Sequence, residues 1–96
     1  MTTPALIAQH DSAAQRFTSD TEGQRSELTY RLAGAVLVLT HTGVPPALER
    51  RGIAAALVRA ALDHARLHGL RVRPQCSYVQ AYMQRHPETL DLLASA

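Results

Sequence analysis

Two stretches in the middle of the chain decide the fold: His41-Thr42-Gly43-Val44-Pro45-Pro46 and, just after them, Glu49-Arg50-Arg51-Gly52-Ile53-Ala54-Ala55. The first follows an apolar run typical of a strand, and the second opens a helical pattern. The first N–H groups of a helix have no partners within it, and its N-terminus carries about half a positive charge. Two arginines beside a glycine at that place therefore predict a binding site for the phosphate of a phosphorylated cofactor.

The length and composition indicate one small domain over residues 1–96. A hydrophobic content of 46% is enough for a packed interior, but there is no Trp and only one Phe, so the core must be aliphatic and rich in alanine. Pairing of two copies would help so small a core. A monomer and a homodimer both stay open.

The charge and the cysteine content exclude several classes of protein. The net charge is only +2 and the ten basic residues, all Arg, are scattered, whereas nucleic-acid binders show a dense basic stripe. A single cysteine, Cys76, excludes an internal disulfide and a paired-cysteine zinc site, so no metal is expected. No run approaches the roughly 18 apolar residues of a membrane span. We expect a soluble cytoplasmic protein that binds neither nucleic acid nor membrane.

The first half of the chain has the two-residue period of strands. Residues 5–8 and 14–18 look like a hairpin around a turn at residues 10–12. Residues 26–32 place Leu28, Tyr30 and Leu32 on one face of a half-exposed strand. Residues 35–40 are apolar on both faces, as in a central strand. The pattern predicts an antiparallel meander.

The second half has a helical period. A helix is expected from Gly52 to Gly69, with Gly69 as a left-handed residue just past its end. Residues 70–73 form a short strand that, after this helix, should pair in parallel with the central strand through a right-handed crossover. A second helix over residues 77–85 would be capped by Ser77, and residues 88–96 could add a helical turn. The fold class is α/β (α+β).

This order of elements resembles the GCN5-related N-acetyltransferase superfamily, and more closely its small single-domain branch, the YjdJ-like or Gcn5-like acetyltransferases. The match covers about two thirds of the chain. The residues that carry it include Tyr30-Arg31, His41-Thr42 with Val44-Pro45, Gly52-Ile53-Ala54, Leu57-Val58, Cys76 with Tyr78-Val79, Tyr82, and Arg85-His86-Pro87-Glu88.

The resemblance implies a compact fold of this family with a parallel strand splay, and acetyl-CoA as the cofactor. It assigns the pantetheine arm to Thr42, Gly43 and Val44, and the pyrophosphate to the loop Arg50, Arg51, Gly52, Ile53, Ala54 and Ala55. This chain departs from the small relatives at two places. They usually carry Glu where it has Gly43, and Gly where it has Arg50.

The same resemblance suggests three catalytic residues. Tyr82 matches the general acid that protonates the departing thiolate of CoA, and Cys76 lies where the acetyl group is expected, which allows an acetyl-cysteine intermediate. With no carboxylate at Gly43, His41 or His86 is left as the general base. Each of these side chains also has a purely structural interpretation: Tyr82 packed on the sheet, Cys76 as a small buried residue, and the histidines as satisfied structural groups.

Two functions therefore stand. The first is acetyl-CoA-dependent N-acetylation of an amine, which belongs to a small molecule or to an exposed peptide. The second is a CoA-binding or interaction module with little or no turnover, which Gly43 and Arg50 favour.

Overall fold

The computed structural model describes residues 8–95. Its elements are β1 (Gln9–Asp11), β2 (Arg16–Thr21), β3 (Gln24–Ala33), β4 (Val36–Gly43), the 3₁₀ turn η1 (Pro46–Leu48), α1 (Ile53–Leu67), β5 (Arg71–Pro74), α2 (Ser77–Arg85) and the 3₁₀ segment η2 (Pro87–Leu92).

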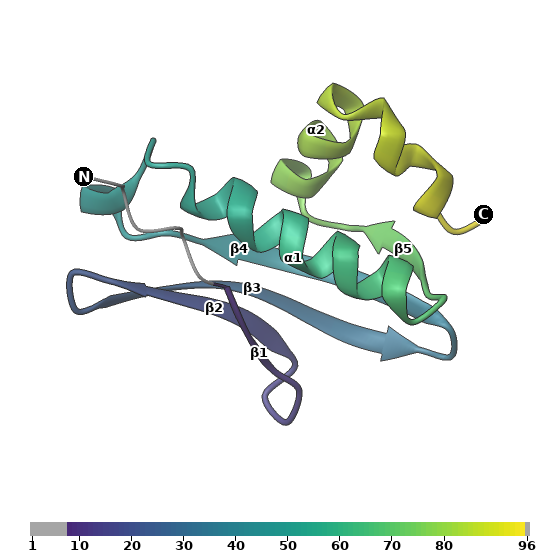
Figure 1. Cartoon of the computed structure of the whole chain (residues 1–96), viewed down its shortest axis with the longest axis horizontal. Helices are drawn as coiled ribbons and strands as arrows, with labels where there is room; N and C mark the ends of the chain where they lie inside the picture. The colour runs from purple at the N-terminus through teal and green to yellow at the C-terminus, as the bar shows by residue number, and fades with distance from the viewer. Residues whose placement is uncertain (1–7, 96) are drawn as a thin grey trace.

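The molecule is built on one five-stranded sheet, whose neighbouring strands follow one another in the sequence, from β1 to β5 (Figure 1). The pairs from β1 to β4 are antiparallel, and β5 joins β4 in parallel after the crossover through α1. Both the predicted meander and the predicted parallel pair are confirmed. The chain after η2 lies beside β5, because Leu93 forms an isolated parallel β-bridge with Val72.

The helix α1 packs on one face of the sheet, and α2 contacts α1 near the β4 and β5 end. The apolar stripe of α1 is fully covered by this packing; its buried members are Ile53, Leu57, Val58, Ala61, Leu62 and Ala65. Gly69 has the predicted left-handed backbone, with a φ of 67°, and the N–H of Leu70 closes the helix on the carbonyl of Ala65 at 2.8 Å. The alanines let the helix approach the strands closely.

Two local predictions were wrong, namely the place of the first turn and the cap of α2. The first turn falls after β1 and not at residues 10–12, because Asp11 Oδ1 accepts a hydrogen bond from the N–H of Ala14 at 3.1 Å and so draws the turn to residues 12–15. Of the strand predicted at residues 5–8, residues 5–7 lie outside the described residues and Ala8 precedes β1. Leu32 lies on the predicted face with Leu28 and Tyr30, but it is 52% exposed because the last three residues of β3 extend past the cover of α1. The residue that caps α2 is Cys76, not Ser77.

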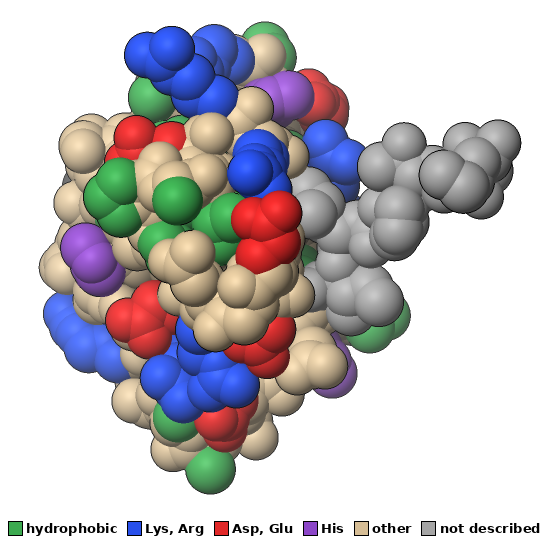
Figure 2. All heavy atoms as spheres, turned by 90° about the vertical axis from the view of Figure 1, so that its left-hand side faces the viewer, with side chains coloured by type: hydrophobic (Ala, Val, Ile, Leu, Met, Phe, Trp, Pro, Cys, Tyr) green, Lys and Arg blue, Asp and Glu red, His purple; other side chains and the backbone are tan. Residues whose placement is uncertain are grey.

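The end of the molecule where β4 finishes and α1 begins is seen face on in Figure 2. Arginine and acidic side chains alternate over this end, with an apolar patch among them. No helix within residues 8–95 has the length and apolar character needed to cross a membrane.

Candidate active site between strands β4 and β5

A bulge divides β4 into two halves. Thr29 of β3 lies opposite His41 and the next residue, Tyr30, lies opposite Leu39, so Thr40 has no opposite residue. The extra residue is fixed by its hydroxyl, which lies 2.8 Å from Thr29 Oγ1 and donates to the Thr29 carbonyl at 3.1 Å. Side chains of a strand point alternately to the two faces of the sheet, and the extra residue of a bulge shifts this alternation by one for every residue that follows. Thr42 therefore faces the α1 side of the sheet.

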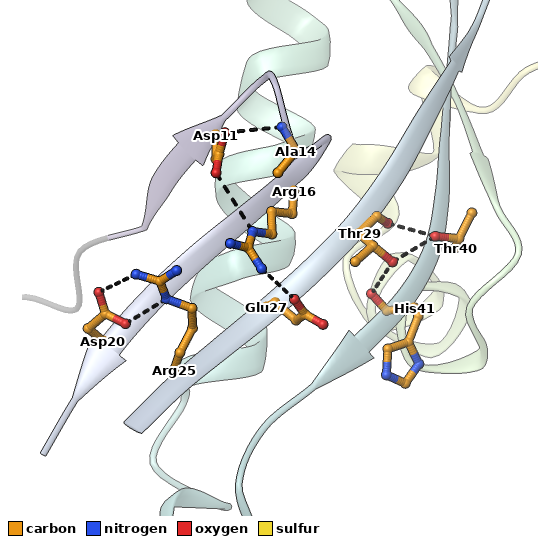
Figure 3. A network of polar contacts seen from close by, with 9 residues as sticks. All are labelled: Asp11, Ala14, Arg16, Asp20, Arg25, Glu27, Thr29, Thr40 and His41. Atoms are coloured by element: carbon orange, nitrogen blue, oxygen red, sulfur yellow. Dashed lines mark hydrogen bonds and ion pairs between the residues drawn. The ribbon is translucent and has the colours of Figure 1, made fainter. Parts of the chain in front are cut away.

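His41 projects from the opposite face of the sheet. Figure 3 shows it with the polar side chains of β2 and β3 that point away from α1. A Cβ on Gly43 would lie 3.3 Å from His41 Nε2, so position 43 shares this face with His41. We call the face turned away from α1 the open face.

Beyond the bulge, β4 and β5 part. Their pairing runs from Val36 opposite Arg71 to Leu39 opposite Pro74 and then ends. The Leu39 carbonyl accepts the N–H groups of both residues that follow Pro74, at 3.0 and 3.1 Å, and the chain turns away into α2. Within the described part of the chain, residues 40–43 have a strand partner on the β3 side only. Their free edge can pair with an extended ligand, as an added strand would.

A cavity of about 530 Å³ opens at this place. It lies between the end of β4, the loop before α1 and the start of α2, and its lining residues are Thr42, Gly43, Val44, Leu48, Glu49, Arg50, Gly52, Ile53, Ala54 and Tyr78. Most of the wall is apolar, which suits a long, thin organic ligand with a few polar contacts.

The N-terminus of α1 forms one wall of the cavity. Its first internal hydrogen bond runs from the N–H of Ala56 to the carbonyl of Gly52 at 3.0 Å, and no side chain caps the helix. The N–H groups of residues 53–55 therefore have no partner within the helix, and they add to the positive end of the helix dipole. Gly52 itself has a φ of 80°, which glycine adopts without strain. The start of α1 therefore has the free donors that the predicted phosphate site would need.

The two arginines of the loop differ in their surroundings. Arg50 lines the cavity and has a φ of 66°, a left-handed backbone that costs a non-glycine residue about 1–2 kcal/mol. Arg51 does not line it; its Nη1 lies 3.1 Å from Glu22 Oε2 in the turn between β2 and β3. Ala55 also lies outside the lining. Arg50 is thus the basic side chain beside the free N–H groups.

Cys76 stands across the opening from β4. Its Sγ lies 3.5 Å from Thr42 Oγ1, so a thiol and a hydroxyl meet where the two strands part. Burial alone would raise the pKa of this thiol, but the hydroxyl of Thr42 and the N–H groups at the start of α2 outweigh burial and lower it. Those N–H groups belong to Tyr78 and Val79, although neither forms a full capping hydrogen bond.

The tyrosine singled out from the sequence lies away from the cavity lining. Tyr82 is 5% exposed, its ring stacks on His86 with centroids 4.1 Å apart, and its hydroxyl raises the pKa of Arg59 on α1. Tyr78, one turn earlier on α2, lines the cavity instead. Sequence reasoning missed Tyr78, and its position two residues after Cys76 was the available signal.

The comparisons with known proteins point to one family and one fold. Residues 16–92 match a family model described as GCN5-related N-acetyl-transferase. The chain is 38% identical over 85 residues to Protein NATD1 of Gallus gallus, covering 85% of this chain and 77% of that protein. Protein NATD1 of Homo sapiens is also 38% identical, with coverages of 85% and 75%. The solution structure of a GCN5-like protein from Staphylococcus aureus superimposes with a TM-score of 0.74 at 22% identity, over 95% of this chain and 90% of that one.

Proposed function

Because the chain belongs to the GCN5-related N-acetyltransferase family, we propose that it transfers the acetyl group of acetyl-CoA to an amine. The observation that carries this proposal is the opening between β4 and β5, which joins a free strand edge to an uncapped helix N-terminus. A strand edge pairs with the amide groups of a pantetheine arm, and free N–H groups bind a pyrophosphate. The donors present fit such a cofactor.

Each part of the cofactor has residues to hold it. The pantetheine arm would lie along Thr42, Gly43 and Val44, between β4 and the start of α2. The pyrophosphate would accept hydrogen bonds from the N–H groups of residues 53–55, with Arg50 as its charged partner. Arg51 would also contact the pyrophosphate if its ion pair with Glu22 opened. The thioester would then lie at Thr42 and Cys76, where β4 and β5 part.

The transfer requires that the amine nitrogen bond to the acetyl carbon while the carbon–sulfur bond breaks. The nitrogen gives up a proton and the departing thiolate takes one. His41, on the open face beside Gly43, is the base that we assign to the amine. The proton for the thiolate comes from a tyrosine of α2, and the cavity lining favours Tyr78 over the Tyr82 of the sequence-based hypothesis.

Cys76 has two possible roles in this reaction. Its lowered pKa and its place in the opening support a nucleophile that carries the acetyl group briefly, with the CoA thiolate as the leaving group. Its contact with Thr42 equally supports a structural role. A gain in mass of one acetyl group after incubation with acetyl-CoA, absent in Cys76→Ala, would establish the first role. Full turnover by Cys76→Ala would establish the second.

A CoA-binding module with little turnover is the second candidate. The strained backbone of Arg50 and the absence of a side chain at Gly43 favour it. Consumption of acetyl-CoA with a panel of small amines and peptide amines separates the two. Turnover above the rate of spontaneous hydrolysis supports the transferase, and binding of CoA without such turnover supports the module.

Binding itself is tested with Arg50→Asn, since Asn tolerates the left-handed backbone while the substitution removes the guanidinium group. Loss of a charged hydrogen bond to phosphate predicts at least a tenfold weaker affinity for CoA and no change for pantetheine. Arg85→Asn, in the exposed last turn of α2, is the matched control. Equal loss for CoA and pantetheine would contradict the assignment of the phosphate to the start of α1.

A further inference from the structure

Two arginines flank the centre of the open face. Arg31 on β3 and Arg73 on β5 both lie opposite Val38 of β4, so the three residues form one row across the sheet. The neighbours Leu37 and Val72 point into the core under α1, which directs this row to the other side. Figure 3 views this face, with the helices behind the strands.

The charges of Arg31 and Arg73 are not balanced by neighbours. Within residues 8–95 neither guanidinium forms an ion pair or a hydrogen bond. Two other arginines of the open face are paired: Arg16 lies 3.3 Å from Glu27 Oε1, and Arg25 lies 2.9 Å from Asp20 Oδ1. Arg71, two residues before Arg73 and on the same face, donates to the carbonyl of Asp91 at 2.7 Å. Arg31 and Arg73 are therefore the arginines of this face that have no partner within residues 8–95.

The floor between the two arginines is apolar. Val38 is 0% exposed although it is no part of the core under α1, so its neighbours on the open face must cover it. Arginine stems commonly cover apolar surface in this way while the guanidinium stays in water. The two strands lie roughly 10 Å apart, one strand spacing on each side of β4, so both guanidinium groups can reach one small anion above Val38.

The row lies close to the opening. It stands one residue before Leu39 and Pro74, the last paired residues, and two residues before Thr40. At about 3.3 Å per residue, the anion position is about 7 Å from the place where β4 and β5 part. The cavity for the cofactor lies on the α1 side of the sheet. An acceptor therefore reaches the opening between β4 and β5 from the open face.

We propose that the acceptor is a small amine that also carries a carboxylate or phosphate, with the anion held by Arg31 and Arg73 and the nitrogen at the opening beside Thr40. Guanidinium groups match both anions with paired hydrogen bonds. This inference rests on the proposed acetyl transfer. The nitrogen bonds to the acetyl carbon, the carbon–sulfur bond breaks, and the proton lost by nitrogen leaves through His41.

Binding is tested first, without turnover. 5-Aminopentanoate and its methyl ester are titrated into ¹⁵N-labelled protein in the presence of CoA, and 3-aminopropyl phosphate and 3-aminopropanol form a second pair; the two anionic amines are long enough to span the distance of about 7 Å. We expect the amide signals of Arg31, Val38 and Arg73 to shift with the two anionic amines and not with the neutral ones. Equal shifts with acid and ester, or shifts confined to other residues, would overturn the proposal. The lower Kd of the two anionic amines tells a carboxylate acceptor from a phosphate acceptor.

Turnover is tested with Arg31→Gln and Arg73→Gln. Each should lower kcat/KM for the preferred anionic amine about tenfold and leave that for its neutral partner within twofold. Arg25→Gln, on the same face but paired with Asp20, is the control and should change neither. If both arginine variants lose nothing, the inference fails while the transferase stands. If the anionic amines bind at the row and no amine is acetylated, the transferase fails while the anion site stands.

Discussion

The two halves of β4 differ in their surroundings and in their use. Residues 36–39 have β3 on one side and β5 on the other, and three of these four side chains are buried. Residues 40–43 have only β3 beside them and none is buried. The second half begins at Thr40, the extra residue of the bulge. The first half contributes to the stability of the domain, and the second half has the free edge and accessible side chains that the proposed cofactor would contact.

The largest effect is expected from Leu39→Ala in the paired half. Leu39 is fully buried beneath the helices, and loss of such a side chain costs about 2–5 kcal/mol of unfolding free energy. Urea unfolding measures it. Thr42→Ala in the free half is the matched change and should cost less than about 1 kcal/mol. Similar losses for the two would contradict the division of β4.

Deletion of Thr40 breaks the comparison directly. Without the extra residue His41 follows Leu39 directly, so His41 and Thr42 keep their faces, but β4 loses the bend of the bulge that lets it part from β5. We expect a folded protein with at least tenfold weaker CoA affinity, measured by calorimetry. Thr40→Ala keeps the residue count and loses only the hydrogen bonds to Thr29, so its affinity should stay within twofold of the parent. Unchanged affinity in the deletion variant would show that the bulge does not position the site.

Arg50→Gly is expected to have a smaller effect of opposite sign. Glycine removes the strain of the positive φ but also gives the unfolded chain more conformational entropy, which opposes folding. The net gain in the free energy of unfolding is about 0.5–1 kcal/mol. Thermal unfolding measures this gain. A loss of stability would mean that the Arg50 side chain makes a stabilising contact that outweighs the strain.

The smallest effect concerns pH and lies far from the free half of β4. Burial, with the charges of His10 and His68, lowers the pKa of His64 on α1 below 6.5. The unfolded chain then binds more protons than the folded one just below pH 6.5, so stability is full above that pH and falls as the pH drops through the folded pKa. Urea unfolding between pH 7.5 and 5 should show this slope, reduced in His64→Gln. An equal slope in the variant would place the titrating group elsewhere.

Much of the fold followed from local signals in the sequence. The period of the apolar residues gave α1, and glycines at 52 and 69 marked its ends because both need a left-handed backbone. The helix start at which we propose that the phosphate binds followed from the same signals, because the residues of a helix start identify it.

The parts of the site that depend on pairing could not be predicted in this way. Thr40, His41 and Thr42 read as simple alternation, and only their register with β3 reveals the bulge. Helical period likewise groups Tyr78 with Tyr82 on one face of α2 and cannot tell which of them reaches the cavity. The strain at Arg50 did have a signal, because the glycine of small relatives at that position indicates a positive φ.

The direct test of the central claim is a titration of CoA into ¹⁵N-labelled protein followed by NMR. The account predicts that the amide signals of residues 42–44, 52–55 and 76–78 shift together, at one affinity, while those of Arg31 and Arg73 do not move. No binding, or shifts centred on the open face, would contradict the claim that the opening between β4 and β5 holds the cofactor.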